Sequence, residues 1–142
     1  FLDAIAKGGG TGKVLAVNAA DPTDSKHKVS AALGEGIDGI MTLGPLGAGP
    51  ALAALKEGGH MGKVKLGTFD LTPEVINGIK DGNLEFAIDQ QQYLQGYLPI
   101  VLLSQYKLYG VMPAGGILPT GPGFVTKANA AQVLELSSKG IR

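Results

Sequence analysis

The sequence predicts an α/β fold: a doubly wound, mainly parallel sheet with helices on both faces. The first observation is that short apolar strands alternate with helical segments along most of the 142 residues. The second is that the connections between strands are long enough to hold a helix, which favours parallel pairing with right-handed crossovers. The third is a hydrophobic content of 44%, which is enough to build one sizeable core.

The elements of the first part follow from apolar spacing and from residues that start or end helices. Leu2, Ile5 and Ala6 follow helical spacing, and three glycines end that helix at residues 8–10. The segment Asp21-Pro22-Thr23-Asp24 supplies cap residues for the next helix. The expected order is a helix from residue 1, a buried strand at 13–17, a helix at 21–34, a strand at 37–43, a glycine-rich turn at 44–50 and a helix at 51–56.

The second part contains the clearest helix start of the chain. Thr72 is placed to cap a helix, with Pro73 at its first position and Glu74 in its first turn. The glycines at positions 82 and 110 end helices. The expected order is a strand at 63–69, a helix from 72 to 81, a strand at 84–88, a long helix at 93–109, an irregular segment at 113–123, a short strand at 124–126 and a helix at 128–137.

Polar side chains follow two neighbouring strands of this predicted sheet. Asp70 comes directly after one strand, and Asp89-Gln90-Gln91-Gln92 follows the end of the next. Ligands of open α/β sheets bind at the carboxyl ends of parallel strands, so an acid and an amide delivered there form a plausible polar binding pair. The alternative is that Asp70 caps a turn and the glutamines lie in a solvated loop.

Composition excludes several classes of function. Lys and Arg number 12, as do Asp and Glu, so the chain lacks the basic excess of a nucleic-acid binder. Cysteine is absent, which excludes disulfides, zinc thiolate sites and thiol nucleophiles. His27 and His60 each lie alone, so no metal site is expected. The longest apolar run, 97–103, is too short to span a membrane.

Two glycine-rich segments do not match cofactor-binding motifs. Residues 8–13 resemble a phosphate loop, but Val14 replaces the required Ser or Thr and the segment follows a helix instead of a strand. Residues 44–50 follow a strand, but their spacing is not that of the dinucleotide fingerprint, so they are expected to line a ligand cleft. No serine has a nucleophile-elbow context and no carboxylates face each other, so catalytic residues and cofactors are not expected.

The segment KLGTFDLTPEVINGIKDGNLEFAIDQQQYLQ, residues 65–95, resembles the ribose-type periplasmic sugar-binding proteins of bacterial ABC importers. The resemblance extends to the KVLAV segment, the Asp-Pro-Thr-Asp helix start, the Ile-Asp-Gly-Ile strand and the C-terminal Gly-Pro-Gly-Phe-Val-Thr. It implies that Asp70 accepts hydrogen bonds from sugar hydroxyls and that Gln90 binds the same sugar. The chemistry agrees, because a carboxylate accepts strong bonds from hydroxyls and an amide offers a donor and an acceptor.

Further candidate ligand-binding residues are Phe69, Gln91, Gly44 and Pro45. Phe69 offers an apolar face to a sugar, although a place in the core is the more ordinary role for it. Where many relatives carry an Asn-Asp pair, this sequence has Gly44-Pro45. One usual sugar contact is therefore lost, and the identity of the sugar does not transfer.

The resemblance also implies a division of the chain and a set of partners. Residues 1–90 look like most of the second, C-terminal lobe, and residues 91–142 look like a crossing helix and closing segments that pack on a missing first lobe. The apolar face of residues 94–108 is then expected to contact that lobe or a second copy of the chain in a homodimer. A periplasmic location and a membrane permease as partner follow from the same resemblance, without nucleic acid as a partner.

Two other classes of function remain open from the sequence. The sugar effector domain of a lactose-repressor-like transcription regulator shares the fold and the cleft. A small α/β enzyme using Asp70 as a general base is the second alternative, but it needs a proton-transfer partner that the sequence does not supply.

Overall fold

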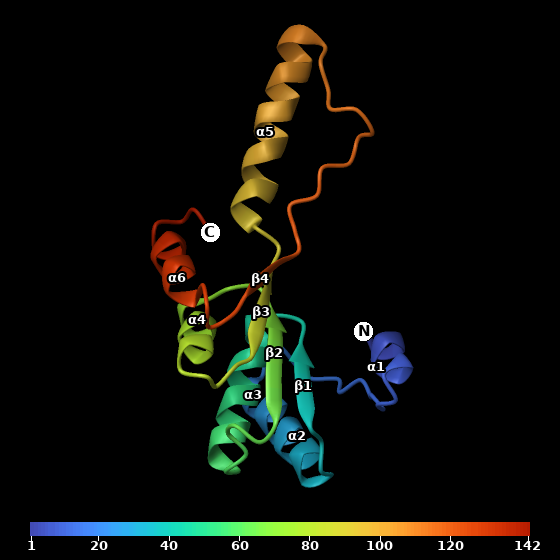
Figure 1. Cartoon of the computed structure of the whole chain (residues 1–142), viewed down its shortest axis with the longest axis vertical. Helices are drawn as coiled ribbons and strands as arrows, with labels where there is room; N and C mark the ends of the chain where they lie inside the picture. Colours follow the sequence, from blue (N-terminus) through green and yellow to red (C-terminus); the bar gives the residue numbers. More distant parts are fainter.

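The structure is a computed structural model that describes residues 1–142. A four-stranded sheet forms its centre. Its strands lie side by side in the order β1-β2-β3-β4, where neighbours β1, β2 and β3 pair in parallel and β4 runs antiparallel to β3. The mainly parallel α/β sheet that the sequence predicts is confirmed (Figure 1). The strands are β1 (Gly39–Thr42), β2 (Lys65–Phe69), β3 (Phe86–Asp89) and β4 (Gly123–Val125).

The chain forms six helices, of which α2, α3, α4 and α6 pack with the sheet, and two of these four are capped by side chains of the segments expected to cap them. The side chain of Asp21 accepts the N–H groups of Thr23 and Asp24 at the start of α2, and Thr72 accepts the N–H of Val75 at the start of α4. Each bond satisfies a backbone donor that has no partner within the first turn of a helix. The helices are α1 (Leu2–Lys7), α2 (Pro22–Gly34), α3 (Pro45–Glu57), α4 (Pro73–Lys80), α5 (Gln92–Tyr109) and α6 (Ala130–Ser138).

One hydrophobic core joins the sheet to helices α2, α3, α4 and α6. Leu66, Ala87 and Val125 enter it from three different strands because alternate strand residues face the same side. On the opposite side Gly67 lies against the ring of Phe86, where a Cβ would come within 2.7 Å of Cζ. The packing of α2 on α3 and of α6 on α4 encloses the core.

The strand predicted at residues 13–17 is wrong. These residues are exposed, and none of their backbone groups bonds to another backbone group. Val14 is 80% exposed, so its β-branched side chain has no sheet surface on which to pack. The apolar composition of the segment favours a strand, but a strand forms only where a neighbour accepts its hydrogen bonds.

The turn predicted at residues 44–50 is also wrong. Helix α3 begins at Pro45 with Gly44 as its N-cap, and it continues through Pro50 to Glu57. Proline is well suited to the first turn of a helix, where its missing N–H has no intrahelical partner. The small residues of this segment therefore begin a helix, in which Ala48 is fully buried.

Helix α5 projects from the end of the sheet, and residues 110–122 return beside it to β4 (Figure 1). No residue of α5 is buried. Segments β4 and α6, in contrast, pack on β3 and α4 and belong to the same body as β1–β3 and helices α2–α4. Helix α5 and the returning segment extend away from this body (Figure 1). None of the helices has the combined length and apolar character needed to cross a bilayer.

Candidate functional site

The candidate site lies where β2 and β3 end side by side. In the parallel register of these strands Phe69 pairs with Ile88, and the N–H of Asp70 donates to the carbonyl of Ile88 at 2.9 Å. Asp70 is the first residue after β2, and Gln90 is the first after β3. The strand pairing therefore brings together two residues that are twenty positions apart in the sequence.

Three side chains form a hydrogen-bonded cluster at this edge. Gln90 Nε2 and Gln92 Nε2 each donate to Oδ1 of Asp70 at 2.7 Å. No protein group donates to the other carboxylate oxygen, Oδ2. Asp70 is half-buried and both glutamines are exposed, so the cluster is accessible from solvent. We call Asp70, Gln90 and Gln92 the carboxylate–amide cluster.

Two left-handed backbone positions shape the cluster. Asp70 has φ 63° and Gln91 has φ 57°, and no other residue apart from glycines has a positive φ. Asp tolerates this region better than most residues, whereas for Gln it is uncommon. At Gln91, the N-cap of α5, the chain changes from strand to helix, and this turn lets the side chains on either side of it reach one carboxylate oxygen.

Asp89 holds that turn in place from inside the protein. Its side chain is fully buried, with Oδ1 accepting the N–H of Gln91 at 2.7 Å and Oδ2 accepting Nε of Arg142 at 2.7 Å. A buried carboxylate requires such partners because losing its hydration costs several kcal/mol. The C-terminal residue of the chain thus stabilises the segment that positions the cluster.

The segment that returns from α5 is hydrogen-bonded to the backbone of Gln90. Thr120 Oγ1 donates to the carbonyl of Gln90 at 2.9 Å, and Gln95 Nε2 donates to the same oxygen at 3.1 Å. The carbonyl of Gln90 therefore accepts one bond from α5 itself and one from the segment that returns from α5 to β4.

The other predicted site residues lie near this edge of the sheet without joining the cluster. Phe69 is half-buried at the end of β2, and Gln91 caps α5 without a side-chain hydrogen bond. Gly44 and Pro45 begin α3 after β1, whose Thr42 donates its hydroxyl to Thr68 of β2 at 2.6 Å. Of the six residues singled out from the sequence, the structure joins only Asp70 and Gln90 by a side-chain bond.

Three residues that shape this region were not among the site residues predicted from the sequence: Gln92, Asp89 and Arg142. Gln92 had a signal, because it lies two positions after Gln90 in a run of amides. Asp89 also had one, as an acid at the end of an apolar strand. Arg142 had none, since it is 53 residues from its partner and only the tertiary fold brings it close.

The cluster is suited to binding polar ligands. The free Oδ2 of Asp70 accepts donors, and the amide oxygens of Gln90 and Gln92 are further acceptors because their nitrogens face the carboxylate. His, Asp and Glu residues do not gather in groups of three or more that would hold a metal ion. The arrangement therefore suits ligands that present several hydrogen-bond donors, such as hydroxyl groups.

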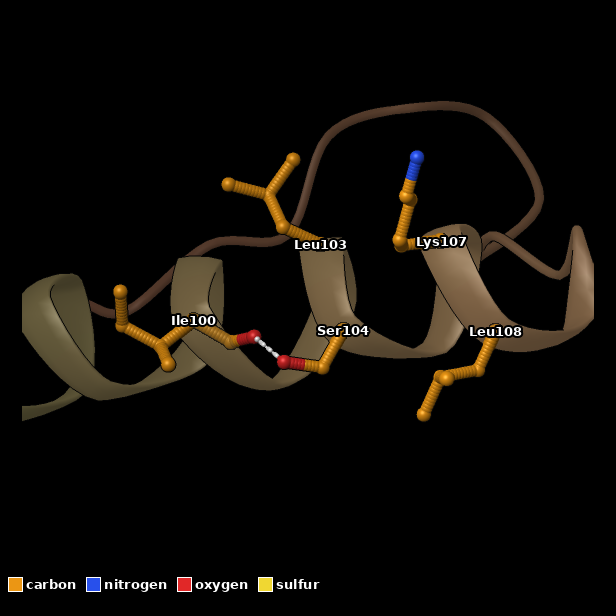
Figure 2. Close-up of a pocket in the computed structure, with 5 residues that line it drawn as sticks. All are labelled: Ile100, Leu103, Ser104, Lys107 and Leu108. Carbon is orange, nitrogen blue, oxygen red and sulfur yellow. Dashed lines mark hydrogen bonds between the residues drawn. The ribbon is translucent and has the colours of Figure 1, made fainter.

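Two shallow surface hollows lie away from the cluster. One is on the exposed side of α5, lined by Ile100, Leu103, Ser104, Lys107 and Leu108. Figure 2 shows that the Ser104 hydroxyl donates a hydrogen bond to the carbonyl of Ile100, at 2.8 Å. Because this hydroxyl is already bonded within the helix, the lining of the hollow is mostly apolar. The other hollow lies between α3 and α4.

Comparison with known proteins identifies the family. The family profile described as "Periplasmic binding protein domain" matches residues 1–109. The chain belongs to this family. Among the curated relatives of this periplasmic binding protein is the xylose/arabinose-binding protein XylF of Sulfolobus acidocaldarius, 40% identical over 68 residues, which are 48% of this chain and 17% of the relative.

Solved structures agree with the family and show its fold. A carbohydrate transporter from Acidothermus cellulolyticus, solved in complex with myo-inositol, has a TM-score of 0.83 and 37% identity, covering 94% of this chain and 47% of its own. A galactofuranose-binding protein has a TM-score of 0.79 at 18% identity, covering 98% of this chain and 49% of its own, which shows the fold alone. This periplasmic binding protein chain thus spans about half the length of the solved structures it resembles.

Proposed function

We propose that this chain is part of a substrate-binding protein of an ABC sugar importer and that it binds a monosaccharide or polyol through Asp70 and Gln90. The observation that carries the proposal is the carboxylate–amide cluster at the carboxyl ends of β2 and β3. Ligands of open α/β sheets bind at that edge. The role of the chain is binding and transport, with no catalytic step.

The chemistry of the cluster supports a hydroxylated ligand. A carboxylate oxygen accepts charge-assisted hydrogen bonds from hydroxyl groups, and these are about twice as strong as bonds between neutral groups. The relatives support the same class, since one is named for binding xylose and arabinose and another was solved with myo-inositol. All three compounds are neutral and carry several hydroxyl groups.

The exposed face of α5 supports a second lobe as the structural partner. Ile100, Leu103 and Leu108 are 66%, 60% and 68% exposed, which leaves an apolar surface in water. Surfaces of this kind usually have a partner. In the proposed arrangement the body of the chain is most of one lobe, and α5 with residues 110–122 packs on the other; a homodimer through α5 is the alternative.

The two lobes would close on the ligand, and a membrane permease would recognise the closed state. A ligand that contacts both lobes stabilises the closed form by its differential affinity for that form. The family supports a location in the periplasm or outside the cell. In this mechanism Phe69, Gln91, Gly44 and Pro45 border the ligand cleft at the same sheet edge.

Ligand-induced thermal stabilisation tests the proposal. The longest natural chain that contains these residues is screened against pentoses, hexoses, inositols and linear polyols. A ligand at 100 times its Kd stabilises the folded protein by about 2.7 kcal/mol, which gives a clear rise in Tm. Positive compounds are then titrated by calorimetry.

The deciding variant is Asp70→Asn, because Asn tolerates the left-handed backbone of this position as well as Asp does. We expect its Kd to rise about 100-fold through the loss of bonds to a charged acceptor. Asp38→Asn is the matched control, since it removes one carboxylate charge in the same way and Asp38 is exposed with no side-chain hydrogen bond. A protein that binds no compound of the panel, or an Asp70→Asn protein that binds normally, would contradict the proposal. Binding of an operator DNA by the same protein would favour the transcription regulator.

A further inference from the structure

We propose that Gln92 is a ligand-positioning residue, which together with Gln90 holds Oδ1 of Asp70 and thereby directs Oδ2 to the ligand. The inference rests on the proposed function and deepens it, because it assigns separate roles to the two carboxylate oxygens. Its basis is the pair of 2.7 Å bonds that end on one oxygen and leave the other without a protein donor.

The geometry fixes the orientation of all three side chains. A carboxylate accepts hydrogen bonds and does not donate them, so both glutamines must turn their nitrogens toward Asp70. Their amide oxygens therefore point away from the carboxylate. With Oδ2, they form a set of three acceptor oxygens, which suits several hydroxyl donors of one ligand and disfavours a carboxylate or phosphate group.

The position of Gln92 is built into the fold. The left-handed Gln91 separates it from Gln90, and the N–H of Gln91 is bonded to the buried carboxylate of Asp89. Gln92 is also the first residue of α5, so its backbone is fixed by the helix.

A second amide on Oδ1 has a physical consequence for binding. With Gln90 alone, the carboxylate is free to rotate about its Cβ–Cγ bond and to present either oxygen. Two donors on one oxygen oppose that rotation, so less conformational freedom is lost when a ligand binds Oδ2. Pre-organisation of this kind raises affinity mainly by lowering the cost of ordering the site.

The test compares Gln92→Met with Gln132→Met in the longest natural chain that contains these residues. Methionine keeps the length and helix propensity of glutamine but removes its amide. Gln132 lies in helix α6, outside the helix proposed to contact a second lobe, is exposed and makes no side-chain hydrogen bond, so it is the control. The measurements are the Kd for the sugar or polyol found by the thermal screen, the Tm without ligand, and the side-chain amide resonances of Gln90 and Gln92.

We expect Gln92→Met to raise the Kd about tenfold, as the loss of a hydrogen bond to a charged group does, while its Tm stays close to that of Gln132→Met. In the ligand-free protein, Asp70→Asn should shift the side-chain amide resonances of both Gln90 and Gln92. Gln92→Met should in turn shift those of Gln90, because the two amides share one acceptor.

Several results would overturn the inference. If only the Gln90 amide responds to Asp70→Asn, the shared acceptor does not exist. If the wild-type protein binds its sugar and both methionine variants bind equally well, Gln92 does not position the carboxylate, while the proposed function stands. A lower Tm of Gln92→Met with an unchanged Kd would mean that Gln92 only stabilises the start of α5. If no polyol or sugar binds the wild-type protein, the proposed function fails and the inference fails with it.

Discussion

Removing the side chain of Arg142 should destabilise the protein strongly. Its Nε lies 2.7 Å from Oδ2 of Asp89, whose side chain is fully buried, whereas the side chain of Arg142 is 30% exposed. Arg142→Met therefore leaves a buried carboxylate with the N–H of Gln91 as its remaining partner. Breaking a buried pair in this way costs about 3–5 kcal/mol, and partial solvent access at Arg142 places the expected loss near about 3 kcal/mol.

Substituting the other partner of the ion pair, Asp89, should lower the free energy of unfolding by less. Asp89→Asn removes the buried charge and keeps an oxygen that accepts the N–H of Gln91, while the guanidinium of Arg142 regains water at its exposed part. We expect a loss of about 1–2 kcal/mol. In the double variant no charge remains buried, so its loss should be smaller than the sum of the two single losses by about 2 kcal/mol.

Urea unfolding of the four proteins measures these differences as changes in the free energy of unfolding. Lys139→Met is the control, because Lys139 forms an exposed pair with Glu135 at the same distance of 2.7 Å, and such pairs contribute about 0.3–0.5 kcal/mol. The reasoning is refuted if Arg142→Met loses no more stability than Lys139→Met, or if the losses of the two single variants simply add.

Three further predictions concern the helix start, the strand packing and the exposed helix. Thr72→Ala should lower the free energy of unfolding by about 1 kcal/mol, measured by thermal denaturation, because the N–H of Val75 loses its cap. Gly67→Ala should cost about 1–3 kcal/mol, since its Cβ would lie 2.7 Å from Phe86 Cζ, and Phe86→Leu should recover part of that loss. Ile100→Ala should cost about 2 kcal/mol or more in urea unfolding of the complete protein if a second lobe covers α5, and a change within about 0.5 kcal/mol would contradict that arrangement.

Local signals in the sequence were enough to predict most elements. Thr72 caps α4 and Gly110 ends α5 in the left-handed conformation, because the residues that satisfy or terminate a helix act within one turn of it. The placement of Asp70 and Gln90 at one edge was also predictable, since parallel strands end on the same side of a sheet.

Local sequence patterns did not predict which distant segments pair or pack together. Residues 13–17 have the composition of a strand but find no neighbour in the sheet. The proline and glycine residues at 44–50 are typical of a turn, yet they begin a helix whose small side chains pack into the core. In both cases burial and hydrogen-bond partners, which depend on the whole fold, outweighed local propensity.

The sequence by itself determined the α/β class, the helix boundaries set by caps, and the acid and amide at the ends of neighbouring strands, because each depends on residues close together in the chain. The tertiary structure alone decided that Gln92 shares the acceptor of Gln90 and that Arg142 neutralises Asp89. These contacts arise from strand register, a left-handed turn and a return of the chain over 53 residues, and such geometry exists only once the sheet has formed.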